Sequence, residues 1–178
     1  DGGRAAYFRG MDMQSTGADA PSTTPVTIYR KDYTPPAWAV PTIALDFALD
    51  LTATRIINTM QVERRADSPL TLRGDGLSAD DVRVDGVVVN DWAMDGDDLI
   101  LPLSGERHEV TITTTINPST NTQLMGLYAS NGMLCTQCEA EGFRRITFHP
   151  DRPDVLSRYS VHMAGDKAAF PVLLSNGD

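Results

Sequence analysis

The stretch TIALDFALDL, residues 42–51, indicates the fold class of this chain. Its apolar side chains recur at every second position, and Asp46 and Asp50 fall on the opposite face. The alternating apolar residues are Ile43, Leu45, Phe47, Leu49 and Leu51. A period of two is that of a β-strand with one buried face, because successive side chains of an extended chain point to opposite sides. We therefore predict a half-buried strand here.

The same alternation continues along most of the chain. It recurs in RIINTMQVER (55–64), LTL (70–72), VRV (82–84), LILPL (99–103), EVTITTTI (109–116), RYSVHM (158–163) and FPVLL (170–174). The dipeptide Asp85-Gly86 is typical of a two-residue hairpin turn, whereas residues 130–154 show little alternation and are expected to form a long excursion from the sheet. No window of eleven or more residues has a helical period. The sequence therefore predicts an all-β fold, an antiparallel β-sandwich or saddle-like pair of sheets.

Composition divides the chain near residue 26. Residues 1–26 are rich in Gly, Ala, Ser, Thr and Pro without periodicity, which is typical of a flexible tail or linker. Residues 27–178 carry the alternating segments and are predicted to form one β domain. Asn176-Gly177 is a hairpin signal followed by a single residue, so we expect this domain to be incomplete at its C-terminal end.

Charge and hydropathy argue against several classes of function. Fifteen basic and 24 acidic residues give a net charge of −9, which does not favour binding to nucleic acid or to an anionic membrane. No run of apolar residues is long enough for a transmembrane helix, and the first residues lack the apolar core of a signal peptide. Two cysteines are too few for a disulfide framework, so we expect a cytoplasmic protein.

Cys135 and Cys138 form a Cys-x-x-Cys pair within NGMLCTQCEAEGFRR. A thioredoxin-type redox pair needs a helix directly after it, and a glycine four residues beyond the pair disfavours one. A zinc site needs two further ligands, and the candidates His149 and His162 lack the short spacing of compact zinc sites. Redox and zinc chemistry remain alternatives, but we favour thiols that pack as small apolar groups.

Other metal and phosphate motifs are incomplete. His108-Glu109 begins like the H-E-x-x-H motif of zinc peptidases, but Ile112 stands where the second histidine is needed. The acidic stretch MDGDDL, residues 94–99, lacks the ligand spacing of a calcium loop and is predicted to be a solvated turn. The sequence contains neither a Gly-rich phosphate loop nor a G-x-S-x-G turn.

Glu139 and Glu141 directly follow the cysteine pair, and three arginines follow them. Such charges most simply form ion pairs on a surface loop, which contribute little to stability. A glutamate on a loop can also bind the cationic group of a ligand. Residue chemistry alone leaves both possibilities open.

The segment CTQCEAEGFRRITFHPDRPDVLSRY, residues 135–159, closely resembles the aminopeptidase N (alanyl aminopeptidase) family of zinc metallopeptidases. LMGLYAS before it and DKAAFPVLLSNGD after it share the resemblance, and YRKDYTPPAW, residues 29–38, is similar to the opening segment of the family. The similarity therefore runs from about residue 29 to residue 178.

This resemblance implies that the chain is the N-terminal β domain of a larger enzyme that releases N-terminal amino acids from peptides. By correspondence with the family's loop, Glu139 would bind the α-ammonium group of the substrate, and Gln137 would line the pocket for the first side chain. The zinc ligands and catalytic residues would lie beyond Asp178, in a catalytic domain on which this domain packs. The chain alone is therefore expected to bind no metal and to be inactive.

An alternative function is that of a stand-alone β-sandwich module for binding or interaction, without catalytic activity. The coding sequence after Asp178 would distinguish the two, because only the enzyme requires an H-E-x-x-H motif there. His149-Pro150 is a minor departure from the family, whose members often carry aromatic or aliphatic residues at these positions. We therefore expect the packing of this loop to differ locally.

Overall fold

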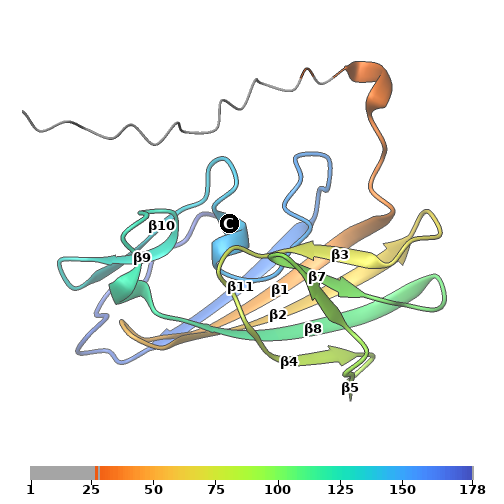
Figure 1. Ribbon diagram of the computed structural model, residues 1–178. Coiled ribbons are helices and arrows are strands. Elements are labelled where there is room, and N and C mark those ends of the chain that lie inside the picture. Colours follow the sequence, from red (N-terminus) through yellow and green to blue (C-terminus); the bar gives the residue numbers. More distant parts are fainter. Residues whose placement is uncertain (1–26, 28, 178) are drawn as a thin grey trace, which may run out of the picture. The chain divides into compact units, whose positions relative to one another are not determined.

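The structure, a computed structural model, describes residue 27 and residues 29–177 (Figure 1). The predicted flexible tail, residues 1–26, lies outside the described residues. Residues from Pro35 onward form one compact unit, and the stretch up to Thr34 belongs to another. None of the described residues belongs to a helix long and apolar enough to cross a membrane.

The all-β prediction is confirmed. The helical elements of the described part are short 3₁₀ turns, namely η1 (Arg30–Asp32), η2 (Pro118–Thr120) and η3 (Phe143–Arg145). The strands are β1 (Trp38–Leu49), β2 (Thr54–Arg64), β3 (Leu70–Arg73), β4 (Ala79–Val84), β5 (Val87–Val88), β6 (Ala93–Asp95), β7 (Asp98–Leu101), β8 (Arg107–Ile116), β9 (Gly126–Ser130), β10 (Met133–Gln137) and β11 (Arg158–Gly165).

These strands form three sheets. The large sheet has the order β11-β1-β2-β8-β4-β5, the small sheet has the order β3-β7-β6, and β9 pairs with β10 as a separate hairpin. Figure 1 shows the small sheet, the β9-β10 hairpin and η3 on the same side of the large sheet. The domain is therefore a layered β structure with one face of the large sheet covered.

The core lies between the large sheet and the elements that cover it. In β1, Ile43 and Leu45 are buried and Asp46 is exposed, as the alternation predicts. The cluster continues through other strands and the segment after η3, with Ile56, Met60, Val62, Leu70, Leu72, Val82, Leu99, Leu101, Val110, Ile112, Ile146 and Phe148. Alternate side chains of both sheets thus meet in one apolar layer.

Buried polar groups fix the segment of residues 146–149 over the large sheet. Asn58 of β2 donates from Nδ2 to the Phe148 carbonyl oxygen at 2.9 Å, and Thr114 of β8 donates from Oγ1 to the Ile146 carbonyl oxygen at 3.2 Å. His149 forms an isolated β-bridge with Arg73 at the end of β3. These bonds satisfy backbone carbonyls that would otherwise be buried without partners.

The β4-β5 turn is the hairpin turn that Asp85-Gly86 predicts. Asp85 has a φ of 51° and Gly86 a φ of 80°, as a two-residue turn with left-handed residues requires. The Asp85 carboxylate accepts from the Glu109 N–H at 2.9 Å and lies 2.7 Å from His108 Nδ1. These hydrogen bonds hold the pKa of Asp85 below its usual range.

One strand pair is parallel, whereas the sequence predicts antiparallel pairs. β11 runs parallel to β1, with Tyr159 opposite Ile43, whereas the other strand pairs of the described part are antiparallel. A purely antiparallel arrangement was therefore wrong for this pair. Side-chain alternation is the same in both directions, so the sequence pattern could not distinguish them.

The strand predicted at residues 170–174 is absent from the described part of the chain. Val172 is 70% exposed and Leu174 is 86% exposed, and β11 forms the edge of the large sheet. An alternating segment becomes a strand only when a neighbouring strand accepts its backbone hydrogen bonds. The hairpin predicted at Asn176-Gly177 is likewise not formed by the described residues.

Candidate functional site

The β9-β10 hairpin places Gln137 at the end of a strand. Asn131 and Gly132 form its turn, with φ values of 50° and 80°, and Gln137 lies opposite Gly126. The excursion from the large sheet predicted over residues 130–154 thus begins as part of a separate two-stranded hairpin, which extends as far as Gln137. The Asn-Gly dipeptide at the turn is a strong hairpin signal and could have revealed this hairpin.

A tight loop follows Gln137 and ends at η3. The Gly142 N–H donates to the Cys138 carbonyl oxygen at 2.8 Å. A Cβ at Gly142 would lie 2.8 Å from the Cys138 Cα and would overlap the Gln137 carbonyl oxygen. Only glycine therefore fits where the loop closes, and the residues between Cys138 and Gly142 are exposed. The peptide bond between Glu139 and Ala140 is cis.

The two residues selected from the sequence lie together on this loop. Gln137 donates from Nε2 to the Glu139 carbonyl oxygen at 3.2 Å, and both side chains are exposed. The Glu139 carboxylate has no hydrogen bond or ion pair with any residue that the structure describes. Glu139 thus presents a carboxylate on the loop surface that is unpaired within the described part of the chain.

The other charged residues near the loop are paired. Arg144 lies 2.6 Å from an Asp151 carboxylate oxygen and 3.2 Å from Glu141. Arg145 lies 2.6 Å from Asp75, a residue 70 positions earlier in the chain. The predicted network of ion pairs thus includes Glu141 but not Glu139.

The two cysteines are free thiols. Cys138 is half-buried and packs against the apolar core, and burial raises the pKa of its thiol, with a further rise from the Asp151 charge. The structure therefore supports the packing role that we favoured for Cys138.

The histidines considered as metal ligands serve other contacts. His149 is buried and bonded to Asp151 and Tyr159, while His162 lies 3.0 Å from Asp46 on the adjacent strand. Among the described residues, no group of three or more His, Cys, Asp or Glu side chains could hold a metal ion. The described part of this chain thus does not provide a zinc site.

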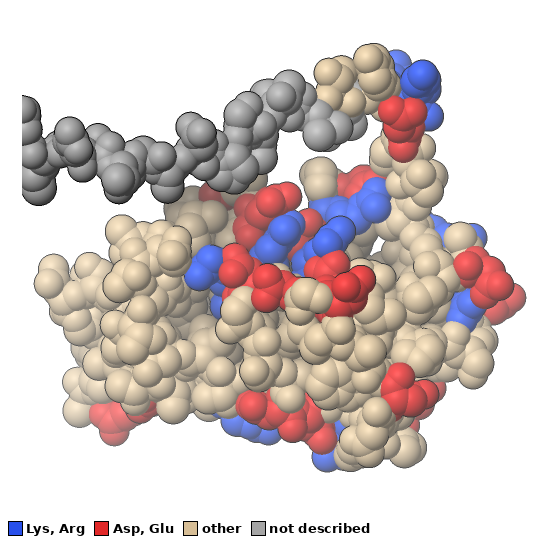
Figure 2. Space-filling model, viewed as in Figure 1, with Lys and Arg blue, Asp and Glu red and all other residues tan. Residues whose placement is uncertain are grey.

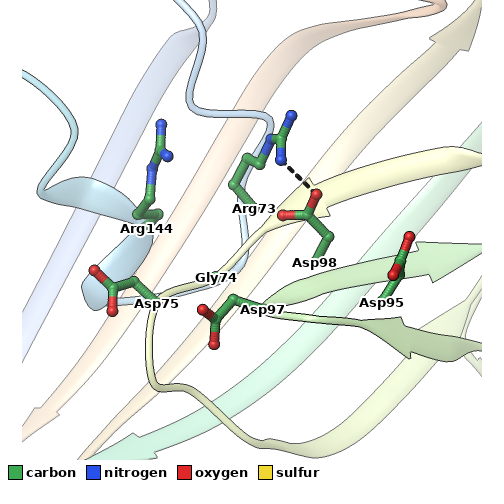
Figure 3. Close-up of a pocket in the computed structure, with 7 residues that line it drawn as sticks. All are labelled: Arg73, Gly74, Asp75, Asp95, Asp97, Asp98 and Arg144. Carbon is green, nitrogen blue, oxygen red and sulfur yellow. Dashed lines mark hydrogen bonds and ion pairs between the residues drawn. The ribbon is translucent and has the colours of Figure 1, made fainter. Parts of the chain in front are cut away.

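A charged hollow of about 320 Å³ lies between β3, the β6-β7 turn and η3. Its lining residues are Arg73, Gly74, Asp75, Asp95, Asp97, Asp98 and Arg144 (Figure 3). The side chains of Arg73 and Asp98 point toward each other, and Arg73 Nη1 lies 2.5 Å from Asp98 Oδ2. Figure 2 shows acidic and basic side chains mixed on this side of the molecule. The hollow includes the MDGDDL turn, which is largely exposed, as predicted.

The sequence matches known proteins over most of its length. The family described as Peptidase M1 N-terminal domain matches residues 44–178. The chain is 43% identical over 159 residues to a protein named aminopeptidase N from Caulobacter vibrioides, a match that covers 87% of this chain and 18% of that protein. The chain thus spans less than a fifth of the length of this relative.

Solved structures share the fold. The crystal structure of Legionella pneumophila aminopeptidase A in complex with aspartic acid has a TM-score of 0.76 at 25% identity, over 83% of this chain and 18% of that chain. The M1 zinc metallopeptidase from Deinococcus radiodurans has a TM-score of 0.61 at 17% identity, over 72% of this chain and 32% of that chain. The family match covers well over half of the chain and agrees with the resemblance seen in its sequence. This chain belongs to the Peptidase M1 N-terminal domain family.

Proposed function

We propose that this chain is the N-terminal domain of a zinc-dependent aminopeptidase that releases N-terminal amino acids from peptides. The names of its relatives support this proposal, because one is an aminopeptidase N and another an M1 zinc metallopeptidase. The zinc ligands would lie outside this chain, in a catalytic domain against which the β domain packs. Within this proposal, the loop of Gln137 and Glu139 is the contribution of the β domain to the substrate site.

Glu139 would bind the α-ammonium group of the substrate. An enzyme that removes one residue must recognise a free N-terminus, and the ammonium charge distinguishes that terminus from an internal peptide nitrogen. The observation that carries this assignment is the exposed Glu139 carboxylate without a partner among the described residues. Its loop is closed at Gly142 and continues from a paired strand, so the carboxylate is held on a defined backbone.

Gln137 would lie beside the first side chain of the substrate. Its amide is neutral, exposed and bonded to the Glu139 carbonyl oxygen, which couples its position to that of the ammonium-binding residue. A neutral amide can donate to or accept from a polar group and can contact an apolar one. We therefore expect substitutions at Gln137 to change side-chain preference more than overall activity.

The decisive experiment replaces Glu139 in the full-length protein. Glu139→Gln preserves size and removes the charge, so it should lower kcat/KM on an aminoacyl-anilide by about 10- to 150-fold, the equivalent of a charge-assisted hydrogen bond of about 1.5–3 kcal/mol. The matched control is Glu141→Gln, because Glu141 lies two residues away and pairs with Arg144. Equal kcat/KM for Glu139→Gln and the wild type would refute the anchoring role.

A second assay tests whether the catalytic groups lie outside this chain. The 178-residue chain alone, with added zinc, should not hydrolyse an aminoacyl-anilide. Turnover by the pure chain would contradict the proposal that the catalytic groups lie outside it.

A further inference from the structure

His149 is a buried imidazole whose two ring nitrogens both have partners. It is 4% exposed. Its Nδ1 accepts from the Asp151 backbone N–H at 2.7 Å, and its Nε2 lies 3.1 Å from the Tyr159 hydroxyl. Because Nδ1 is an acceptor, the proton of the neutral ring lies on Nε2, which donates to the Tyr159 oxygen. These contacts select one neutral tautomer.

The imidazole ring supports the C-terminal end of the Glu139 loop. Phe143, the first residue of η3, meets His149 edge-on, with ring centroids 5.0 Å apart and an interplanar angle of 89°. Phe143 also meets Tyr159 edge-on at 6.1 Å. Because Phe143 directly follows Gly142, which closes the loop, this aromatic contact fixes one end of the loop.

A second set of contacts reaches the loop through Asp151. The Asp151 carboxylate accepts from Arg144 Nε at 2.6 Å, and its carbonyl oxygen accepts from Arg144 Nη2 at 3.2 Å. Arg144 also pairs with Glu141, two residues beyond Glu139. The turn that His149 holds therefore provides the acceptors that orient Arg144 and, through it, the loop.

We propose that His149 is a positioning residue that holds the Glu139 loop in place as a neutral imidazole and releases it when protonated. A proton on Nδ1 would face the Asp151 N–H, which places two donors 2.7 Å apart. The charged ring therefore loses the hydrogen bond that orders the Asp151 turn. The consequence for substrate binding rests on the proposed function of Glu139, but the positioning itself does not.

The surroundings of the ring favour its neutral form. Burial lowers the pKa of His149 to about 4, and the Asp151 charge opposes this shift only in part. Among the described residues, the titratable and charged groups that contact His149 or its direct partners are Asp151, Tyr159, Arg144 and, through its backbone, Arg73. At neutral pH the ring thus remains an acceptor at Nδ1.

Two substitutions separate the two sets of contacts. His149→Phe keeps the aromatic contact with Phe143 but removes the acceptor for the Asp151 N–H. His149→Gln keeps a carbonyl acceptor but removes the ring. Hydrogen exchange in the full-length protein, followed by mass spectrometry, should show about fivefold faster exchange in peptides that contain Gly142 and Asp151, as expected for the loss of a contact of about 1 kcal/mol.

Exchange in β8 should stay unchanged in both variants, because the hydrogen-bond and ring partners of His149 among the described residues lie outside β8. The matched control is His162→Gln, which removes an exposed histidine from β11 and should leave the loop unchanged. The proposal is wrong if the Gly142 amide exchanges at the wild-type rate in a folded His149 variant, even if the Asp151 amide exchanges faster. If one of the two His149 variants does not fold, hydrogen exchange measured in the other still tests the proposal.

Kinetics distinguish this inference from the proposed function. At neutral pH, His149→Phe should raise the KM of the full-length enzyme for an aminoacyl-anilide by up to about tenfold with little change in kcat, as for a loss of uniform binding. Faster exchange at Gly142 with an unchanged KM would support the positioning role and refute substrate binding by Glu139. Unchanged exchange with a lower kcat/KM for Glu139→Gln would refute the positioning role alone.

Discussion

The large sheet and the segment from Gln137 to Asp151 keep their shapes by different means. The sheet buries many apolar side chains from several strands, so its stability is spread over numerous contacts. The segment has little regular structure: Ile146 and Phe148 are buried in the core, but the loop before them depends on a few polar contacts, a closely packed glycine and one buried imidazole. A single substitution should therefore lower the stability of the sheet while preserving its shape, but should change the conformation of the segment.

The largest expected effect is a loss of volume in the sheet. Ile112 of β8 is fully buried, so Ile112→Ala should lower the free energy of unfolding by about 2–5 kcal/mol, and Ile112→Val by about 0.5–1.5 kcal/mol. Urea unfolding of the chain measures both values. Equal effects of the two substitutions would show that packing volume does not govern this part of the core.

Acid should weaken the segment before the carboxylates of the sheet respond. The pKa of His149 lies at about 4 in the folded chain, below the usual value of 6.5, so the unfolded chain binds more protons between these values. Stability is therefore fully present above pH 6.5 and falls by about 3 kcal/mol as the pH decreases to 4. Urea unfolding at several pH values should show this slope, which His149→Gln should remove.

The carboxylate contribution has a lower pH window. The pKa of Asp85 is already held below 3.8, so its stabilising effect is lost only as the pH falls below that value. A stability curve that is flat between pH 6.5 and 4 would show that His149 is not buried as a neutral ring.

A substitution at Gly142, where the Glu139 loop closes, should have an effect of intermediate size on the free energy of unfolding. Gly142→Ala would force its Cβ against backbone atoms of Gln137 and Cys138, which must shift, at a cost of about 1–3 kcal/mol. The matched control is Gly132→Asn, because no atom lies near a Cβ at Gly132 and asparagine tolerates its positive φ. If the proposed function is correct, Gly142→Ala in the full-length protein should raise KM more than Gly132→Asn does.

The smallest effect is expected in the β4-β5 turn. Asp85→Asn keeps an oxygen acceptor for the Glu109 N–H and tolerates the positive φ, but removes the charge beside His108. The Asp85 side chain is 57% exposed, although that of His108 is only 14% exposed, and asparagine keeps the backbone hydrogen bond, so the free energy of unfolding should change by less than about 1 kcal/mol. A larger change in urea unfolding would indicate that this turn contributes more to the large sheet than an exposed ion pair does.

Local patterns predicted the sheet better than the loop. Alternation identified β1, β2 and β8 and their buried faces, because the period of two depends only on neighbouring residues. It failed at residues 170–174, where no adjacent strand is present among the described residues, and it overlooked the β9-β10 hairpin. Gln137 and Glu139 came from the family resemblance, and their roles stay predictions.

By itself, the sequence determined the all-β class, the core residues of the alternating strands and the family, because these follow from patterns along the chain. Only the tertiary structure decided that β11 lies parallel to β1, that Glu141 is paired while Glu139 has no partner among the described residues, and that His149 is buried against Phe143. Each of these outcomes depends on backbone and side chains that the folded chain brings together. Arg145 and Asp75, for example, are 70 residues apart and 2.6 Å from each other. Such contacts have no signature in a local pattern, since they exist only once the chain has folded.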